Sequence, residues 1–100
     1  MFYKNTLTAL REKINKIEPG CVAIYADVQP NTIAPLSYLL WMCNEVAKMD
    51  TNSIDECAKA GRWVGWIFAH AELSGVWDNN HTRDLVREDR RLGYDKPHQF

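Results

Sequence analysis

The sequence predicts an all-α protein, a small bundle of about four helices that forms a single domain over residues 1–100. Apolar residues recur at spacings of three and four over most of the chain, which is the period of a helix packed on one side. Proline, glycine, asparagine and serine interrupt this pattern at intervals that match ordinary helix lengths. The apolar and charged fractions, 46% and 25%, are those of a globular domain with its own core.

The first helix is predicted to begin at Asn5 or Thr6, because either side chain can accept a hydrogen bond from an amide of the first turn. Pro19-Gly20 ends it. Its apolar face is formed by Leu7, Leu10, Ile14 and Ile17.

A short apolar run follows over residues 21–28 and contains Val22, Ile24 and Tyr25. A run of this length fits one short strand or an irregular buried segment, and its periodicity does not distinguish the two. Both alternatives remain compatible with a helical domain.

The second helix is predicted over residues 35–49, after a turn marked by Pro30, Asn31 and Pro35. Ser53 and Glu56 are then spaced as in a capping box, in which the serine hydroxyl and the glutamate carboxylate each satisfy an amide hydrogen at a helix start. The third helix therefore begins there. It continues to Ser74, because Gly75 is the next strong stop signal. The apolar stripe of the second helix is Leu36, Leu39, Leu40, Cys43 and Val46.

The third helix is apolar around most of its circumference. One face packs on the first two helices, and a neighbouring face forms a heptad-like row of large side chains, here called the tryptophan seam. Because only a narrow arc remains for water, the helix is expected to be largely buried. The packing face is Cys57, Ala60, Gly61, Val64, Ile67, Phe68 and Ala71; the tryptophan seam is Trp63, Trp66, His70, Leu73 and Trp77; the arc is Arg62, Gly65, Ala69 and Glu72.

Something must cover the tryptophan seam, because an exposed row of this size would exceed the largest apolar patch of a typical monomer. The cover is the same chain, through the fourth helix and residues 21–28, or it is a second subunit or partner protein. A flat ligand such as a nucleotide is the third alternative.

Gly61 and Gly65 place small residues one turn apart on the third helix, where another backbone can approach closely. In a membrane this spacing favours helix pairing. Charged residues interrupt the segment, and no apolar run approaches the roughly 18 residues of a membrane span. The spacing therefore predicts tight helix packing in a soluble core.

A fourth helix is predicted from Asn79 or Asn80 through Arg91, ended by Gly93 and followed by a tail over residues 94–100. Its arginines alternate with carboxylates at helical spacing, which is typical of a solvated, salt-bridged face. Alternatively, the arginines form a basic stripe that binds phosphate or an acidic protein, with Arg62 contributing to it. The arginines are Arg83, Arg87, Arg90 and Arg91, and the carboxylates are Asp84, Glu88 and Asp89.

No common catalytic motif is present, and the histidines show no spacing of a metal site, so we expect no enzyme activity, cofactor or metal. The net charge of −1 argues against nucleic acid as the partner. Three cysteines without a C-x-x-C pair favour a reducing compartment, and Cys43 is interpreted as a core thiol. With no signal peptide recognised, the predicted location is cytoplasmic.

The leading hypothesis is a non-enzymatic interaction protein, a homodimer or the binder of a protein partner, that uses aromatic and arginine side chains of the third and fourth helices. A binder of a small anionic, nucleotide-like ligand is the first alternative, with rings as a stacking surface and an arginine as phosphate clamp. A nucleic-acid-associated protein is the second. The candidate binding residues are Arg62, Trp63, Trp66, His70, Trp77, Arg83, Arg87 and Arg90.

Two segments, Leu39-Leu40-Trp41-Met42 and Lys59-Ala60-Gly61-Arg62-Trp63-Val64-Gly65-Trp66, resemble small uncharacterised proteins encoded by bacteriophages and prophages. These often carry an Arg-Trp-aliphatic-Gly-aromatic segment on a late helix, followed by an arginine-bearing tail. The resemblance covers the stretch from about Leu36 to Arg87. It implies a protein made in the cytoplasm of an infected bacterium that binds and inhibits a host protein or sequesters a signalling molecule, and it assigns no functional residue.

Overall fold

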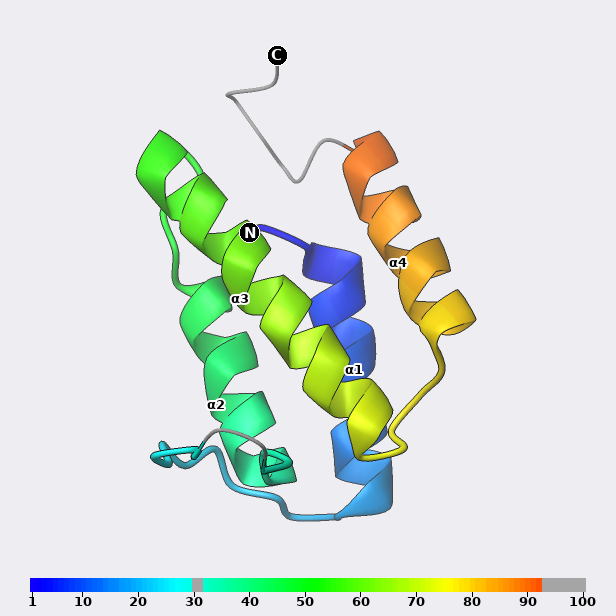
Figure 1. Cartoon of the computed structure of the whole chain (residues 1–100). Coiled ribbons are helices and arrows are strands. Elements are labelled where there is room, and N and C mark those ends of the chain that lie inside the picture. The colour runs from blue at the N-terminus through cyan, green and yellow to red at the C-terminus, as the bar shows by residue number, and fades with distance from the viewer. Residues whose placement is uncertain (30–31, 93–100) are drawn as a thin grey trace.

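The computed structural model describes residues 1–29 and 32–92, with the backbone alone for residues 79, 81, 82 and 90–92. Within this part of the chain there are four helices and no strand, which confirms the predicted all-α class (Figure 1). The predicted stop at Gly93 and the tail over residues 94–100 lie outside the described residues. The helices are α1 (Lys4–Ile17), α2 (Leu36–Ala47), α3 (Ile54–Leu73) and α4 (Asn79–Leu92).

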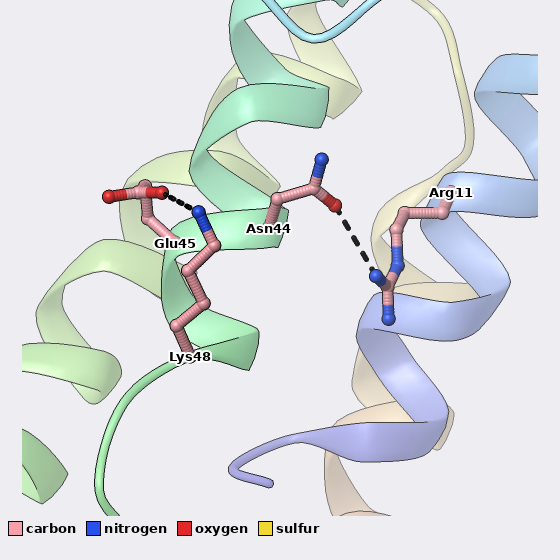
Figure 2. A network of polar contacts seen from close by, with 4 residues as sticks. All are labelled: Arg11, Asn44, Glu45 and Lys48. Carbon is pink, nitrogen blue, oxygen red and sulfur yellow. Dashed lines mark hydrogen bonds and ion pairs between the residues drawn. The ribbon is translucent and has the colours of Figure 1, made fainter.

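The helices pack in a chain of contacts: α2 lies against both α1 and α3, and α4 lies against α1, on the side away from α2 (Figure 1). A polar contact supports the first of these interfaces, because Arg11 Nη1 donates to Asn44 Oδ1 at 3.3 Å (Figure 2). On the surface of α2, Lys48 and Glu45 form an ion pair of 3.0 Å. The buried core draws on α1, α2 and α3 and includes Leu7, Leu10, Ile14, Leu39, Cys43, Val46, Val64, Ile67 and Ala71.

The start of α1 differs from the prediction, because neither Asn5 nor Thr6 is its cap. The residue before the helix is Tyr3, in the left-handed region at φ 54° and without a capping side chain. Asp89 of α4 takes this role: it accepts the N–H of Asn5 at 3.0 Å, the N–H of Thr6 at 2.9 Å and the Thr6 hydroxyl. A carboxylate is favourable there because the amino end of a helix carries partial positive charge.

Asp89 was predicted on a solvated face, and this is wrong, since only 2% of the residue is exposed. It is buried because it satisfies amides that helix geometry leaves without intrahelical partners. One side chain thus joins the first helix to the last.

At the start of α3 the predicted capping box is half formed. Ser53 Oγ accepts the N–H of Glu56 at 3.2 Å, as predicted. The Glu56 carboxylate accepts the N–H of Asp50 instead of that of Ser53, whose own N–H donates to the Asp50 carbonyl at 3.1 Å. At the other end Gly75, with φ 75°, turns the chain after Leu73, as its stop signal predicted.

The predicted close helix contact at Gly61 and Gly65 is wrong. A Cβ atom at Gly65 would meet nothing within 4 Å, and one at Gly61 would lie 3.7 Å from Tyr3 Oη, an ordinary contact. Gly65 is exposed on the outer face of α3. No backbone of the described chain lies close enough to Gly61 or Gly65 to require a residue without a side chain there.

Replacing Gly65 with alanine should therefore stabilise the fold by roughly 0.5 to 1 kcal/mol, because alanine loses less backbone entropy in a helix. Urea denaturation measures the change. Gly75→Ala is the opposite control, expected to cost roughly 1 to 2 kcal/mol because alanine is strained at positive φ. A destabilising Gly65→Ala would contradict the open surface seen here.

Residues 21–29 are irregular and contain no strand. They are not the buried segment that was the other prediction, because Val22, Ile24 and Tyr25 are exposed. The segment crosses the end of the bundle where α2 begins (Figure 1).

Candidate functional site

Six rings from three parts of the chain meet beside the core, and we call them the aromatic cluster. Two pairs are stacked: Tyr38 on Trp41, with ring centroids 5.6 Å apart and planes 9° apart, and Trp66 on His70, with centroids 3.8 Å apart. Edge contacts connect these pairs to each other and to Tyr25, and a tilted contact connects Trp63 to Trp41. The aromatic cluster is Tyr25, Tyr38, Trp41, Trp63, Trp66 and His70.

Helical spacing and the packing of α2 on α3 bring these rings together. Trp63, Trp66 and His70 follow at steps of three and four on α3, and Tyr38 and Trp41 are three residues apart on α2. The helices meet through two ring contacts: the ring centroids of Tyr38 and Trp66 lie 5.7 Å apart, and those of Trp41 and Trp63 lie 6.2 Å apart. Sequence reasoning missed the α2 rings, although their spacing on one helical face was a usable signal.

Tyr25 completes the aromatic cluster from the irregular segment, 5.8 Å from Tyr38 and 5.1 Å from Trp41. Own-chain residues therefore lie over Trp63, Trp66 and His70, although these side chains are only half-buried. The cover comes from α2, through Tyr38 on Trp66 and Trp41 on Trp63, while α4, which was one predicted cover, packs on α1 instead.

His70 fixes the chain that precedes α2. Its Nδ1 atom accepts the N–H of buried Ala34 at 3.0 Å, so the neutral imidazole carries its proton on Nε2. Its ring stacks on Trp66. His70 is thus a positioning residue for the aromatic cluster.

We expect His70→Ala to lower the free energy of unfolding by about 2 kcal/mol, because the buried Ala34 N–H loses its acceptor and Trp66 loses a stacked ring. His70→Asn should recover part of the loss, since the asparagine oxygen can stand where Nδ1 does. Thermal unfolding of both variants measures this. Equal loss in both would mean that ring packing alone matters.

A cavity of about 420 Å³, here called the aromatic cavity, opens between residues 25–28, α2 and α3. Its walls include four rings, those of Tyr25, Tyr38, Trp63 and Trp66, and two opposite charges also line it, Arg62 and Asp27.

The charges at the aromatic cavity are available to a ligand. Arg62 and Asp27 are exposed, and in the part of the chain that the structure describes neither makes a hydrogen bond or an ion pair. Burial raises the pKa of the Tyr38 phenol, and Tyr25 and Asp27 raise it further. Tyr38 therefore stays a neutral hydroxyl near pH 7. The arrangement suits binding of a flat apolar group that carries charge at its ends.

Trp77 does not belong to this site. The chain turns at Gly75, so the helical phase that placed Trp77 on the tryptophan seam no longer applies. Its ring packs edge-on against Phe68, with centroids 6.3 Å apart, and lines a second cavity of about 360 Å³ with Lys13 and Lys16 of α1. Leu73 is exposed at the end of α3. Of the tryptophan seam, Leu73 and Trp77 therefore lie apart from Trp63, Trp66 and His70.

Arg83 and Arg87 of α4 are also separate from the aromatic cavity. Arg83 and Arg87 are exposed on α4, and none of the α4 side chains that the structure describes lines the cavity. The side chain of Arg90 lies outside the described residues. Of the predicted binding residues, the aromatic cavity gathers Arg62, Trp63 and Trp66, with His70 behind them.

Within the described ranges no three histidine, cysteine, aspartate or glutamate side chains form a group that could hold a metal ion. The same residues contain no helix with the length and apolar character needed to cross a membrane. Comparisons of the chain with protein-family models, with curated proteins and with solved structures found no match.

Proposed function

We propose that the protein is a non-enzymatic binding protein that engages another protein through the aromatic cavity and the apolar chain beside it. One observation carries the proposal: the chain segment that forms one wall of the cavity carries large exposed apolar side chains, at Tyr25 in the wall and at Val22 and Ile24 just before it. Val22 is 66% exposed, Ile24 56% and Tyr25 61%. Exposed apolar patches, with aromatic and arginine side chains at their centre, are typical of protein interfaces.

A small ligand is the second candidate, because the volume of the aromatic cavity falls within the range of small-molecule sites. Arg62 could hold a phosphate of such a ligand. A small molecule would cover the cavity but leave Val22 and Ile24 in water. A protein partner covers both, which is why we place it first.

The class of partner that we propose is a host protein in the cytoplasm of a bacterium, which the bound protein inhibits. The support for this is the resemblance to phage-encoded proteins. The segments that carry the resemblance, residues 39–42 and 59–66, contribute Trp41, Trp63 and Trp66 to the aromatic cluster. A second copy of the chain is the other partner to test.

The test compares site variants with matched controls in affinity capture from bacterial cells. Tyr25→Ala and Arg62→Ala remove exposed groups of the aromatic cavity, while Leu73→Ala and Arg87→Ala remove an exposed apolar side chain and an exposed arginine elsewhere. We expect the wild type and both controls to hold a protein that both site variants lose.

Light scattering first establishes whether that protein is a second copy of the chain. A captured set unchanged by Tyr25→Ala and Arg62→Ala would overturn the proposal. For the small-ligand candidate, a nucleotide at a hundred times its Kd should stabilise the fold by about 2.7 kcal/mol.

A further inference from the structure

The segment before α2 has the sequence of a strand without the structure of one. Val22, Ile24 and Tyr25 are β-branched or aromatic, the types enriched in strands. The described residues contain no strand with which the segment could pair. A conflict between local preference and the fold is expected at functional sites.

The backbone of this segment is largely unsatisfied by its own chain. Of the amides of residues 21–29, two donate hydrogen bonds within the described chain: Cys21 to the Glu18 carbonyl at 3.0 Å, and Ile24 to the Ser37 carbonyl at 3.1 Å. The second bond fastens the middle of the segment to the first turn of α2. The remaining N–H groups have no acceptor within the described chain, as in the unpaired row of a sheet edge.

We infer that residues 22–28 form a docking edge to which an extended segment of the partner protein adds as a strand. This inference rests on the proposed function and specifies its binding mode. Main-chain hydrogen bonds would supply affinity, and the pocket beside the edge would supply specificity, as in other cases of strand addition. The bound strand would also cover Val22 and Ile24.

The aromatic cavity indicates the chemistry of the added segment. Residues 25–28 are both part of the docking edge and a wall of the cavity. Because side chains of a strand alternate in direction, a strand on the edge can project one side chain toward α3. The ring walls suit an aromatic side chain, Arg62 a neighbouring carboxylate and Asp27 a neighbouring cation. The partner segment therefore carries an aromatic residue between an acidic and a basic one.

The probes are blocked seven-residue peptides with a central tryptophan, flanked by valine or threonine and by one glutamate and one lysine in either order. The matched controls are the same peptides with alternate backbone nitrogens methylated, which keeps the side chains and removes hydrogen-bond donors. Fluorescence polarisation measures binding, and amide hydrogen exchange of the full chain reports on residues 22–28. The change is made in the peptide, so folding of the protein is not affected.

We expect one charge order to bind more tightly, to slow amide exchange at residues 22–28, and to lose about tenfold in affinity on methylation, the effect of two missing ordinary hydrogen bonds. Arg62→Ala should weaken the same peptide, and Arg87→Ala should not.

Equal binding of the methylated peptide would overturn the docking edge and leave a side-chain pocket, as the proposed function requires. Binding by none of the peptides would also overturn it, while the capture experiment judges the proposed function independently. Exchange at residues 22–28 that slows with protein concentration alone would identify a second copy as the occupant, against the inference.

Discussion

Replacing Asp89 with alanine should lower the free energy of unfolding by about 3 kcal/mol, among the largest effects expected from one side chain outside the apolar core. The carboxylate accepts the N–H groups of Asn5 and Thr6, and the Thr6 hydroxyl. Hydrogen bonds to a charged group contribute more than neutral ones, and buried donors left without an acceptor cost the energy of their lost hydration. Urea denaturation followed by circular dichroism measures the loss.

Asp84→Ala is the matched control, because Asp84 is an exposed carboxylate on the same helix. It should change stability by less than about 0.5 kcal/mol. Asp89→Asn should fall between the two, since the amide keeps one acceptor and loses the charge. If Asp89→Ala and Asp84→Ala were equal, the contact between α4 and the start of α1 would not exist in solution.

The free energy of unfolding should fall steeply between about pH 9 and pH 12. The reason is that the buried thiol of Cys43 holds its proton to a higher pH than the same thiol does in the unfolded chain. Burial raises its pKa from 9.0 to about 12, although nearby Arg11 opposes the shift. A pKa that is higher in the folded state than in the unfolded state contributes its full stabilisation at pH values below the unfolded-state pKa. This contribution is lost as the pH rises to the folded-state pKa. The whole difference corresponds to about 4 kcal/mol.

The control for this prediction is Cys43→Ala, which lowers stability at neutral pH but lacks the thiol titration. Its stability should decline less from pH 9 to pH 12 than that of the wild type, in urea denaturation at each pH. In the native protein iodoacetamide should label half-buried Cys21 and Cys57 before Cys43, as mass spectrometry would show. Equal alkaline declines, or early labelling of Cys43, would contradict a sealed core at this position.

The helix positions were predictable because their signals are local. Ser53 caps α3 through an amide three residues away, and Gly75 ends it through its own backbone conformation. Pro35 stands immediately before α2. Each of these effects acts within one turn of the chain, so the sequence contains the whole interaction.

The start of α1 was not predictable, because its cap comes from Asp89, and no local pattern relates a carboxylate to amides so far away. The candidate site was predictable in part. Trp63 and Trp66 share a helical face that the sequence shows, whereas Tyr25 reaches the aromatic cluster through an irregular segment with no period. Trp77 was misplaced because the helical count was carried past the turn at Gly75.

The partnership of Thr6 with Asp89 has a consequence for synthesis on the ribosome. The two residues are separated by 83 positions, and the amino-terminal part of a nascent chain emerges first. While translation continues toward Asp89, the opening amides of α1 have only water as an acceptor in place of that carboxylate. The helix that is synthesised first, α1, therefore gains the acceptor for its first amides only after nearly the whole chain has been made.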